Sequence, residues 1–206
     1  MAKIDEINRR RSTYGIQDLG GEPGRQIDNT VRERRRVVLH APDPDLVCMD
    51  EEKNRILENL LDGSRKKRSV ISIVGMGGLG KTTIAKRVFN EARAKFGHPV
   101  WIDVSQQYSA VDLLGDILSE VTKLNVKKLE QMTRAEYEAM LYQTMGAKKY
   151  LIVMDDVWDT DVWRMLNPHL PDAQNGSRVL ITSLSVEVAR SADTCTPPYE
   201  LRFLTE

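Results

Sequence analysis

Residues 75–83 read Gly-Met-Gly-Gly-Leu-Gly-Lys-Thr-Thr and separate two segments of different periodicity. Before them, residues 69–74 form a short apolar run rich in β-branched side chains, which is typical of a buried strand. After them, residues 83–94 repeat an apolar side chain every four positions, which is typical of an amphipathic helix. A strand joined to a helix by a glycine-rich turn predicts an α/β fold, because the helix must pack back on the sheet.

The glycine-rich segment fits the phosphate-binding pattern G-x-x-x-x-G-K-[ST]. Glycine lacks the Cβ that would keep phosphate oxygens away from backbone N–H groups, and the start of the helix adds its positive dipole end. Lys81 would reach the β- and γ-phosphates as a mobile charge, and the Thr82 hydroxyl would ligate Mg²⁺. The residues predicted to bind the nucleotide here are Gly75, Gly77, Gly78, Leu79, Gly80, Lys81, Thr82 and Thr83.

Two other interpretations of this segment exist. It could be a glycine-rich surface turn, or the start of a dinucleotide-binding fold, because Gly75, Gly77 and Gly80 also satisfy G-x-G-x-x-G. The Lys-Thr pair at positions 81–82, together with an acidic strand end farther along the chain, favours the phosphate-binding loop.

That acidic strand end is the pair Asp155-Asp156, which follows the apolar run 150–154. Ligands of open α/β sheets bind at the carboxyl ends of strands, so Asp155 is predicted to hold Mg²⁺ through water and Asp156 to act as a base or to orient water. A pair of solvated turn acids is the alternative. Residues 182–184, Thr-Ser-Leu, end a later strand, where the two hydroxyls could approach the γ-phosphate and the leucine could not.

The remaining pattern alternates strands with helices. Further strands are predicted at 100–104, 178–182 and 199–204, and further helices at 111–124, 133–145, 185–191 and from an N-cap at Asp50 to a stop near Gly63. Thr133 and Glu136 form a capping box, and the basic run 65–68 is interpreted as a solvated turn. The fold class is therefore α/β, a three-layer sandwich around a five-stranded parallel sheet.

Composition limits the partners and the compartment. The 206 residues carry 30 basic and 30 acidic side chains, so no nucleic-acid or anionic-membrane partner is predicted. No apolar stretch approaches the ~20 residues that span a bilayer, and the first residues lack a secretory signal. Cys48 and Cys195 lie far apart without metal-type spacing, which indicates a reducing compartment: the cytoplasm, with the nucleus as an alternative.

Five segments in order and at characteristic spacing resemble the NB-ARC nucleotide-binding domain of plant NLR disease-resistance proteins. They are residues 75–83, 100–106 (Val-Trp-Ile-Asp-Val-Ser-Gln), 150–158 (Tyr-Leu-Ile-Val-Met-Asp-Asp-Val-Trp), 175–182 and 186–189. Trp158 after the acidic pair is similar to the coiled-coil subclass. The resemblance implies that residues 1–45 are the end of a coiled-coil domain plus a linker. It also implies that residues 46–206 are the P-loop NTPase core.

The resemblance also implies a function. Members of this family hold ADP at rest, exchange it for ATP on effector perception, and then assemble with other receptor chains or regulatory proteins, with slow hydrolysis resetting the switch. Lys81 and Thr82 would take the phosphates and Mg²⁺, Asp155 the Mg²⁺, and Asp156 the hydrolysis. Val47 and Cys48 would lie beside the adenine.

Three departures from the family pattern leave other functions open. Cys48 stands where the family usually has glycine, Leu184 stands where it commonly has the arginine that senses the γ-phosphate, and the sequence stops at Glu206 before the family's helical subdomains. We therefore expect a fragment. It could serve as a non-catalytic interaction or decoy module. It could also be a working ATPase, although no residue is an obvious arginine finger.

Overall fold

The computed structural model describes residues 49–104, 110–122 and 132–201 of the chain. The strands are β1 (Ser69–Val74), β2 (His98–Asp103), β3 (Tyr150–Val157), β4 (Arg178–Ser183) and β5 (Tyr199–Glu200). The α-helices are α3 (Asp50–Leu61), α4 (Lys81–Ala92), α5 (Ala110–Thr122), α7 (Arg134–Ala147), α8 (Thr160–Leu166) and α9 (Val186–Ala192). Two short 3₁₀ helices are η1 (Arg93–Lys95) and η2 (Asn167–His169).

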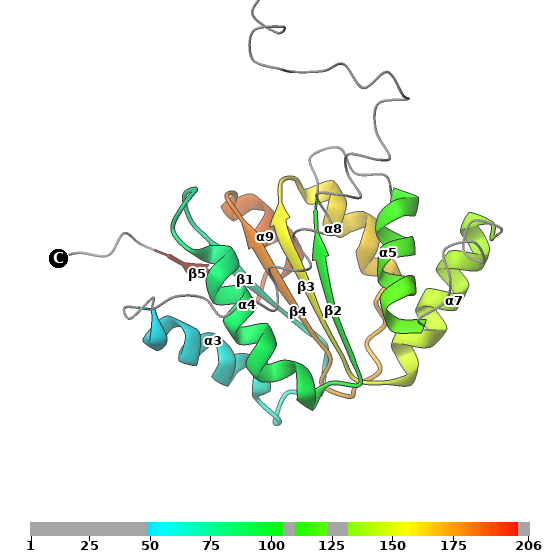
Figure 1. Ribbon diagram of the computed structural model, residues 1–206, viewed down its shortest axis with the longest axis horizontal. Helices are drawn as coiled ribbons and strands as arrows, with labels where there is room; N and C mark the ends of the chain where they lie inside the picture. Colours follow the sequence, from blue (N-terminus) through cyan, green and yellow to red (C-terminus); the bar gives the residue numbers. More distant parts are fainter. Residues whose placement is uncertain (1–48, 105–109, 123–131, 202–206) are drawn as a thin grey trace, which may run out of the picture. The chain divides into compact units, whose positions relative to one another are not determined.

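The five strands form one parallel sheet, as the sequence predicted, and their order in it is β2-β3-β4-β1-β5. The arrows of β2, β3 and β4 in Figure 1 point the same way, and β1 and β5 pair in parallel with their neighbours, so the carboxyl ends of the strands lie at one edge of the sheet. β4 lies between β1 and β3, and therefore separates the strand before the glycine-rich loop from the strand that carries the acidic pair. A side chain at the end of β4 can thus contact both neighbours.

Helices cover both faces of the sheet, which makes the three layers (Figure 1). On one face α4 contacts β1, β3 and β4, and α3 packs beside α4. The apolar side of α4 packs on the sheet, and the Phe89 ring of α4 contacts the Trp101 ring of β2 edge to face, with 5.7 Å between the ring centres. The other face buries the larger core beneath α5, α7, α8 and α9, with Leu113, Leu141 and Trp163 among its members. A parallel sheet buried on both faces explains why its strands read as continuous apolar runs.

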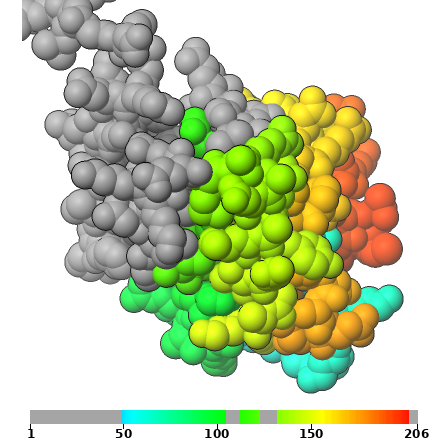
Figure 2. Space-filling view, turned by 90° about the vertical axis from the view of Figure 1, so that its right-hand side faces the viewer, coloured from blue at the N-terminus to red at the C-terminus, as the bar shows by residue number. Residues whose placement is uncertain are grey.

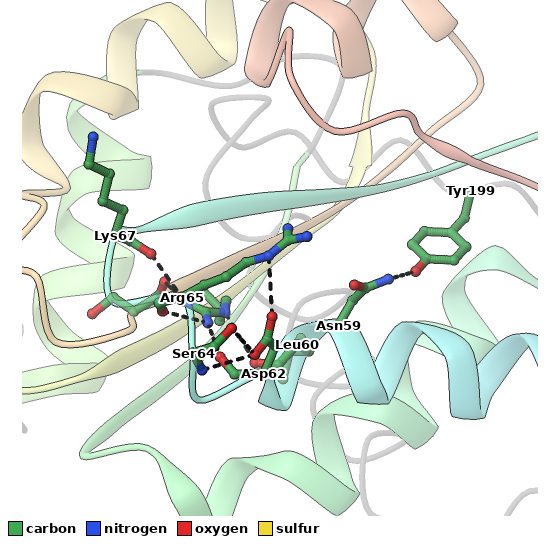
Figure 3. A network of polar contacts seen from close by, with 9 residues as sticks. Asn59, Leu60, Asp62, Ser64, Arg65, Lys67 and Tyr199 are labelled. Carbon is green, nitrogen blue, oxygen red and sulfur yellow. Dashed lines mark hydrogen bonds and ion pairs between the residues drawn. The ribbon is translucent and has the colours of Figure 1, made fainter.

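A buried arginine fixes the connection between α3 and β1. Arg178, at the start of β4, is 1% exposed, and its guanidinium donates hydrogen bonds only to backbone oxygens among the contacts described. The acceptors are the carbonyls of Leu60 (3.1 Å), Asp62 (2.7 Å), Arg65 (2.9 Å), Lys67 (3.2 Å) and Ser177 (3.0 Å). Figure 3 shows the α3–β1 connection with Leu60, Asp62, Arg65 and Lys67 labelled, and dashed lines mark the hydrogen bonds among the residues drawn.

Several predicted boundaries differ from the observed ones. Asp50 is not the N-cap of its helix: Met49 occupies that position without a side-chain cap, and Asp50 begins the helix. β3 continues through the acidic pair to Val157 instead of ending before it. The sequence analysis missed α8, whose N-cap Asp159 accepts hydrogen bonds from two backbone N–H groups of the first turn. The capping box of α7 at Thr133 is confirmed.

Other sequence predictions concern residues outside the described ranges. They include the coiled-coil end and linker over residues 1–45, and the adenine-side pair Val47 and Cys48. They also include the predicted strand beyond Leu201. These remain predictions.

Candidate nucleotide-binding site

The glycine-rich loop joins β1 to α4 and adopts backbone angles that favour glycine. Gly75, Gly78 and Gly80 have φ of 155°, 79° and 84°, and side chains rarely adopt such angles. A Cβ on Gly75 would also lie 3.0 Å from the Leu201 carbonyl oxygen. By contrast, a Cβ on Gly77 or Gly78 would meet nothing within 4 Å, so this part of the loop faces open space. The loop is closed where it meets the protein and open where a ligand would lie.

Lys81 begins α4 and folds back over this loop. Its side chain is 8% exposed, and its Nζ donates hydrogen bonds to the carbonyls of Gly75 (2.8 Å) and Met76 (2.9 Å). Burial lowers the pKa of Lys81, while the carboxylates of Asp156 and Asp155 oppose that shift. The structure therefore places a partly desolvated ammonium group beside the open side of the loop. Its hydrogen bonds there are to carbonyls, which a phosphate could replace.

Asp155 is the centre of a second cluster, where the end of β3 meets the start of α4. It is 5% exposed, and both its carboxylate oxygens lie 3.0 Å from the Thr82 hydroxyl. Thr182, from the end of β4, donates a third hydrogen bond of 2.6 Å. Burial raises the pKa of Asp155, the two threonine hydroxyls lower it, and the neighbouring carboxylates of Asp103 and Asp156 raise it. The hydrogen bonds from the two threonines therefore do not fully offset the cost of burying the negative charge of Asp155.

A β-bulge in β3 sets the orientation of Asp155 and Asp156. The β3–β4 register shifts between Met154 and Val157, so two residues of β3 oppose one residue of β4. Asp156 lies in this bulge with φ of 60°, a left-handed conformation that is uncommon for residues other than glycine. Its backbone N–H donates to the Thr182 hydroxyl at 2.8 Å. One threonine thus joins both acidic residues, and it holds the strained backbone of the second.

The residues around this cluster depart from two sequence expectations. Ser183 is fully buried and its hydroxyl donates to the Val157 carbonyl at 2.7 Å, so it is used inside the fold and does not face a phosphate. Thr182 is engaged with the acidic pair, so it positions Asp155 in place of the predicted direct approach to phosphate. Leu184 is 45% exposed, which is unusual for so large an apolar side chain.

Three exposed hydrophobic residues mark the carboxyl edge of the sheet: Met76, Trp158 and Leu184. They follow β1, β3 and β4 respectively, and so surround the strand ends that carry the two clusters.

The donor set fits the group that the sequence predicted. A hydroxyl and a carboxylate are the hard oxygen ligands that Mg²⁺ prefers, and Thr82 and Asp155 bring one of each within hydrogen-bond distance. The open loop, the start of α4 and the Lys81 ammonium supply donors and positive charge for phosphate. Together these features define the class: an α/β protein of the P-loop NTPase fold.

The comparisons with known proteins then give the family. Residues 49–206 match the NB-ARC domain, so the chain belongs to the NB-ARC family, a nucleotide-binding module of plant disease-resistance proteins. It is 37% identical over 212 residues to disease resistance protein RPP13 of Arabidopsis thaliana, covering 98% of this chain and 25% of that protein. It is 35% identical over 190 residues to ToMV resistance protein Tm-2(2) of Solanum lycopersicum, covering 91% of this chain and 21% of that protein. The chain thus spans about a quarter of the length of these relatives.

Solved structures support the fold. Cdc6p from Pyrobaculum aerophilum superposes with a TM-score of 0.59 at 14% identity, covering 80% of this chain and 48% of that one. The ORC2 protein of Aeropyrum pernix gives a TM-score of 0.53 at 18% identity, covering 81% and 51%. At such identities the likeness concerns the fold alone. Within the described residues, no helix combines the length and apolarity that crossing a membrane requires.

Proposed function

We propose that this chain is the nucleotide-binding core of a plant innate-immune receptor, which binds ADP or ATP with Mg²⁺ and acts as a nucleotide-dependent switch in the defence response. The observation that carries the proposal is the cluster of Thr82, Asp155 and Thr182, assembled from α4, β3 and β4 beside the open glycine-rich loop. Residues so far apart in sequence are brought together where a Mg²⁺–phosphate complex would need them.

The proposed roles follow from this arrangement. Lys81 would exchange its hydrogen bonds with the loop carbonyls for bonds to the β- and γ-phosphates. Thr82 would ligate Mg²⁺ directly, and Asp155 would hold it through water, since the ion would supply the charge compensation that the buried carboxylate lacks. Asp156 would orient the attacking water, and the loop glycines with Leu79 and Thr83 would surround the phosphates.

The proposal extends to the organisation of the chain. The core would span residues 46–206, preceded by the end of a coiled-coil domain and a linker over residues 1–45, with Val47 and Cys48 beside the adenine. Hydrolysis would be slow at most, because the phosphate edge shows no arginine aimed at the loop among the described contacts. The cytoplasm is the proposed location, and other receptor chains or regulatory proteins are the proposed partners.

Nucleotide binding is tested by thermal melts of the full 206-residue chain with and without Mg·ADP and Mg·ATP. Ligand at about 100 times its dissociation constant stabilises a protein by about 2.7 kcal/mol, which raises Tm by roughly 5–10 °C for a chain of this size. Lys81→Ala should abolish the rise. Lys86→Ala, on the same helix, is the matched control and should retain it. A cooperative melt that neither nucleotide shifts would overturn the binding proposal.

Switching needs a separate readout, because a ligand shifts a conformational equilibrium only by its difference in affinity for the two states. Limited proteolysis and sedimentation should therefore differ between the ADP and ATP complexes of the chain. Identical patterns, with both nucleotides bound, would refute the switch while leaving nucleotide binding intact.

A further inference from the structure

The edge of the sheet opposite the phosphate site collects positive charge. Four connecting segments meet at the amino ends of the strands: residues 62–68, 93–97, 148–149 and 171–177. They contain eight lysine and arginine residues but only two carboxylates, Asp62 and Asp172. The lower margin of Figure 2 shows the cyan α3–β1 connection beside the orange segment before β4. We call this surface the basic edge; its exposed cations are Arg65, Lys66, Lys67, Arg93, Lys95 and Lys148.

The segments are in direct contact, so the charges belong to one surface. The Gly97 N–H donates to the Lys149 carbonyl at 2.8 Å, and the Gly176 N–H donates to the Lys66 carbonyl at 2.7 Å. The Lys149 ammonium lies 4.5 Å from the centre of the Phe96 ring. Burial lowers the pKa of Lys149, and the positive charges of Arg178, Lys66 and Lys95 lower it further. The cations therefore repel one another at close range.

The two carboxylates do not neutralise this surface. Asp62 accepts hydrogen bonds from the Ser64 backbone and hydroxyl, and its ion pair among the described residues is with Arg65, three positions along the chain, at 3.2 Å. Asp172 accepts two backbone N–H bonds, from Arg68 and Gln174, at 3.0 Å each. Both carboxylates thus hold the local backbone in shape.

The backbone of the α3–β1 connection, which carries four of the eight cations, is held in place by hydrogen bonds. The guanidinium of Arg178 and the Gly176 N–H together draw the carbonyls of Asp62, Arg65, Lys66 and Lys67 inward. The side chains of Arg65, Lys66 and Lys67 in this segment are exposed. Figure 3 shows the Lys67 ammonium pointing away from the hydrogen-bonded carbonyls. Ordering this backbone costs conformational entropy, and it keeps the positive charges close enough to repel one another. A partner with negative charges would offset that repulsion.

The chemistry of the edge favours carboxylates on a protein surface. No large hydrophobic side chain is exposed on these segments in the described structure, so the edge has neither a base-stacking platform nor an apolar anchor for a bilayer. The Arg65 and Arg68 side chains are already engaged, with Asp62 and with Asn167, which leaves mostly lysine ammonium groups as point charges. A backbone held in place suits a structured partner better than a fluid lipid surface.

We propose that the basic edge docks an acidic surface of a different protein, one that presents several aspartate and glutamate carboxylates. Within the 206 residues, the longest run of carboxylates is the three residues 50–52, so the sequence shown contains no extended acidic segment that could serve as an internal partner. The surface is independent of the nucleotide site, because the two lie at opposite ends of the parallel strands.

The test uses the full chain and a fluorescein-labelled peptide of about 20 residues in which glutamate alternates with serine, followed by anisotropy. The edge variant is K66E/K95E/K148E. The matched control R134E/R164E/R190E changes the net charge equally, at exposed arginines on α7, α8 and α9. Wild type and control should bind alike, and the edge variant should bind at least about tenfold more weakly, since three attractive pairs become repulsive. Binding should weaken as salt rises from about 50 to 300 mM.

Each other outcome overturns the proposal. If the control binds the peptide as weakly as the edge variant, and melts show that both are folded, then binding depends on the net charge of the chain and not on the basic edge. If neither weakens, another basic segment such as residues 32–36 carries the interaction. Tighter binding to phosphatidylserine vesicles or to a single-stranded DNA of equal charge would indicate a membrane or a nucleic acid. Salt-sensitive self-association in sedimentation would indicate a second copy. Lys81→Ala should bind the peptide normally, which separates this test from that of nucleotide binding.

Discussion

Replacing Arg178 by alanine should destabilise the domain strongly, because the loss concerns five backbone acceptors at once. The side chain is 1% exposed, and its bonds to the carbonyls of residues 60, 62, 65, 67 and 177 are 2.7–3.2 Å long. A hydrogen bond to a charged group contributes about 1.5–3 kcal/mol, and a carbonyl left buried without a donor costs about 1–3 kcal/mol. Water can reach part of the exposed connection after the change, so the five losses will not add fully.

We therefore expect a loss of about 3–5 kcal/mol, similar to breaking other buried charged networks. This is a large share of the 5–15 kcal/mol that typically holds a domain together. At about 2–4 °C per kcal/mol, Tm should fall by roughly 10 °C. Urea titration and scanning calorimetry of the nucleotide-free chain measure both quantities.

Two variants serve as controls. Arg134→Ala removes an exposed arginine from a surface pair with Glu138, and its Tm should stay within about 2 °C of wild type. Arg178→Lys keeps the charge but can donate at most three hydrogen bonds, so its Tm should lie between those of wild type and Arg178→Ala. If Arg178→Ala and Arg134→Ala melt at the same temperature, the carbonyl cluster does not stabilise the fold as argued.

Three further predictions concern the phosphate edge. Asp155→Asn should raise the Tm of the nucleotide-free chain at neutral pH. The pKa of Asp155 is raised in the folded protein, so the folded protein loses stability as pH rises through that pKa. An uncharged asparagine does not carry this cost. The same variant should lose the Mg²⁺-dependent part of nucleotide affinity, and a Tm below wild type would contradict the first claim. Gly80→Ala should lower Tm through its φ of 84° and the contact with Met49, whereas Gly77→Ala, with nothing within 4 Å, should keep Tm and weaken only nucleotide binding. Thr182→Val should lower Tm by roughly 2–12 °C, from about 1–3 kcal/mol for the unpaired Asp156 N–H and the lost bond to Asp155. Unchanged urea and thermal midpoints would refute this role.

The sequence predicted the fold because its strands are buried on both faces. Apolar runs such as 69–74 and 150–154 have no polar alternation to confuse with a helix, and each is bounded by glycine or charge. The capping box at Thr133 needs only local geometry, and the structure confirms it. By contrast, the sequence analysis missed α8, although Asp159 before it is a residue type that commonly caps helices.

Those parts of the candidate site that consist of a local sequence motif could be predicted. The glycine loop and the acidic pair could each be found from adjacent residues, because strand ends gather at one edge of a parallel sheet. The role of Thr182 could not, since it depends on β4 lying between β1 and β3 and on the bulge at Asp156. The clustering of positive charge was hidden by the balance of 30 basic and 30 acidic residues, which reports the sum of the charges and not their placement.

The position of Trp158 gives the protein a built-in optical reporter. It is 41% exposed and lies two residues after Asp156, whereas Trp101 and Trp163 are 9% and 3% exposed. A soluble quencher such as acrylamide should therefore extinguish the emission of this indole first. Occupancy of the neighbouring cluster can then be followed by quenching in the unlabelled wild-type chain, and Trp158→Phe would supply the blank.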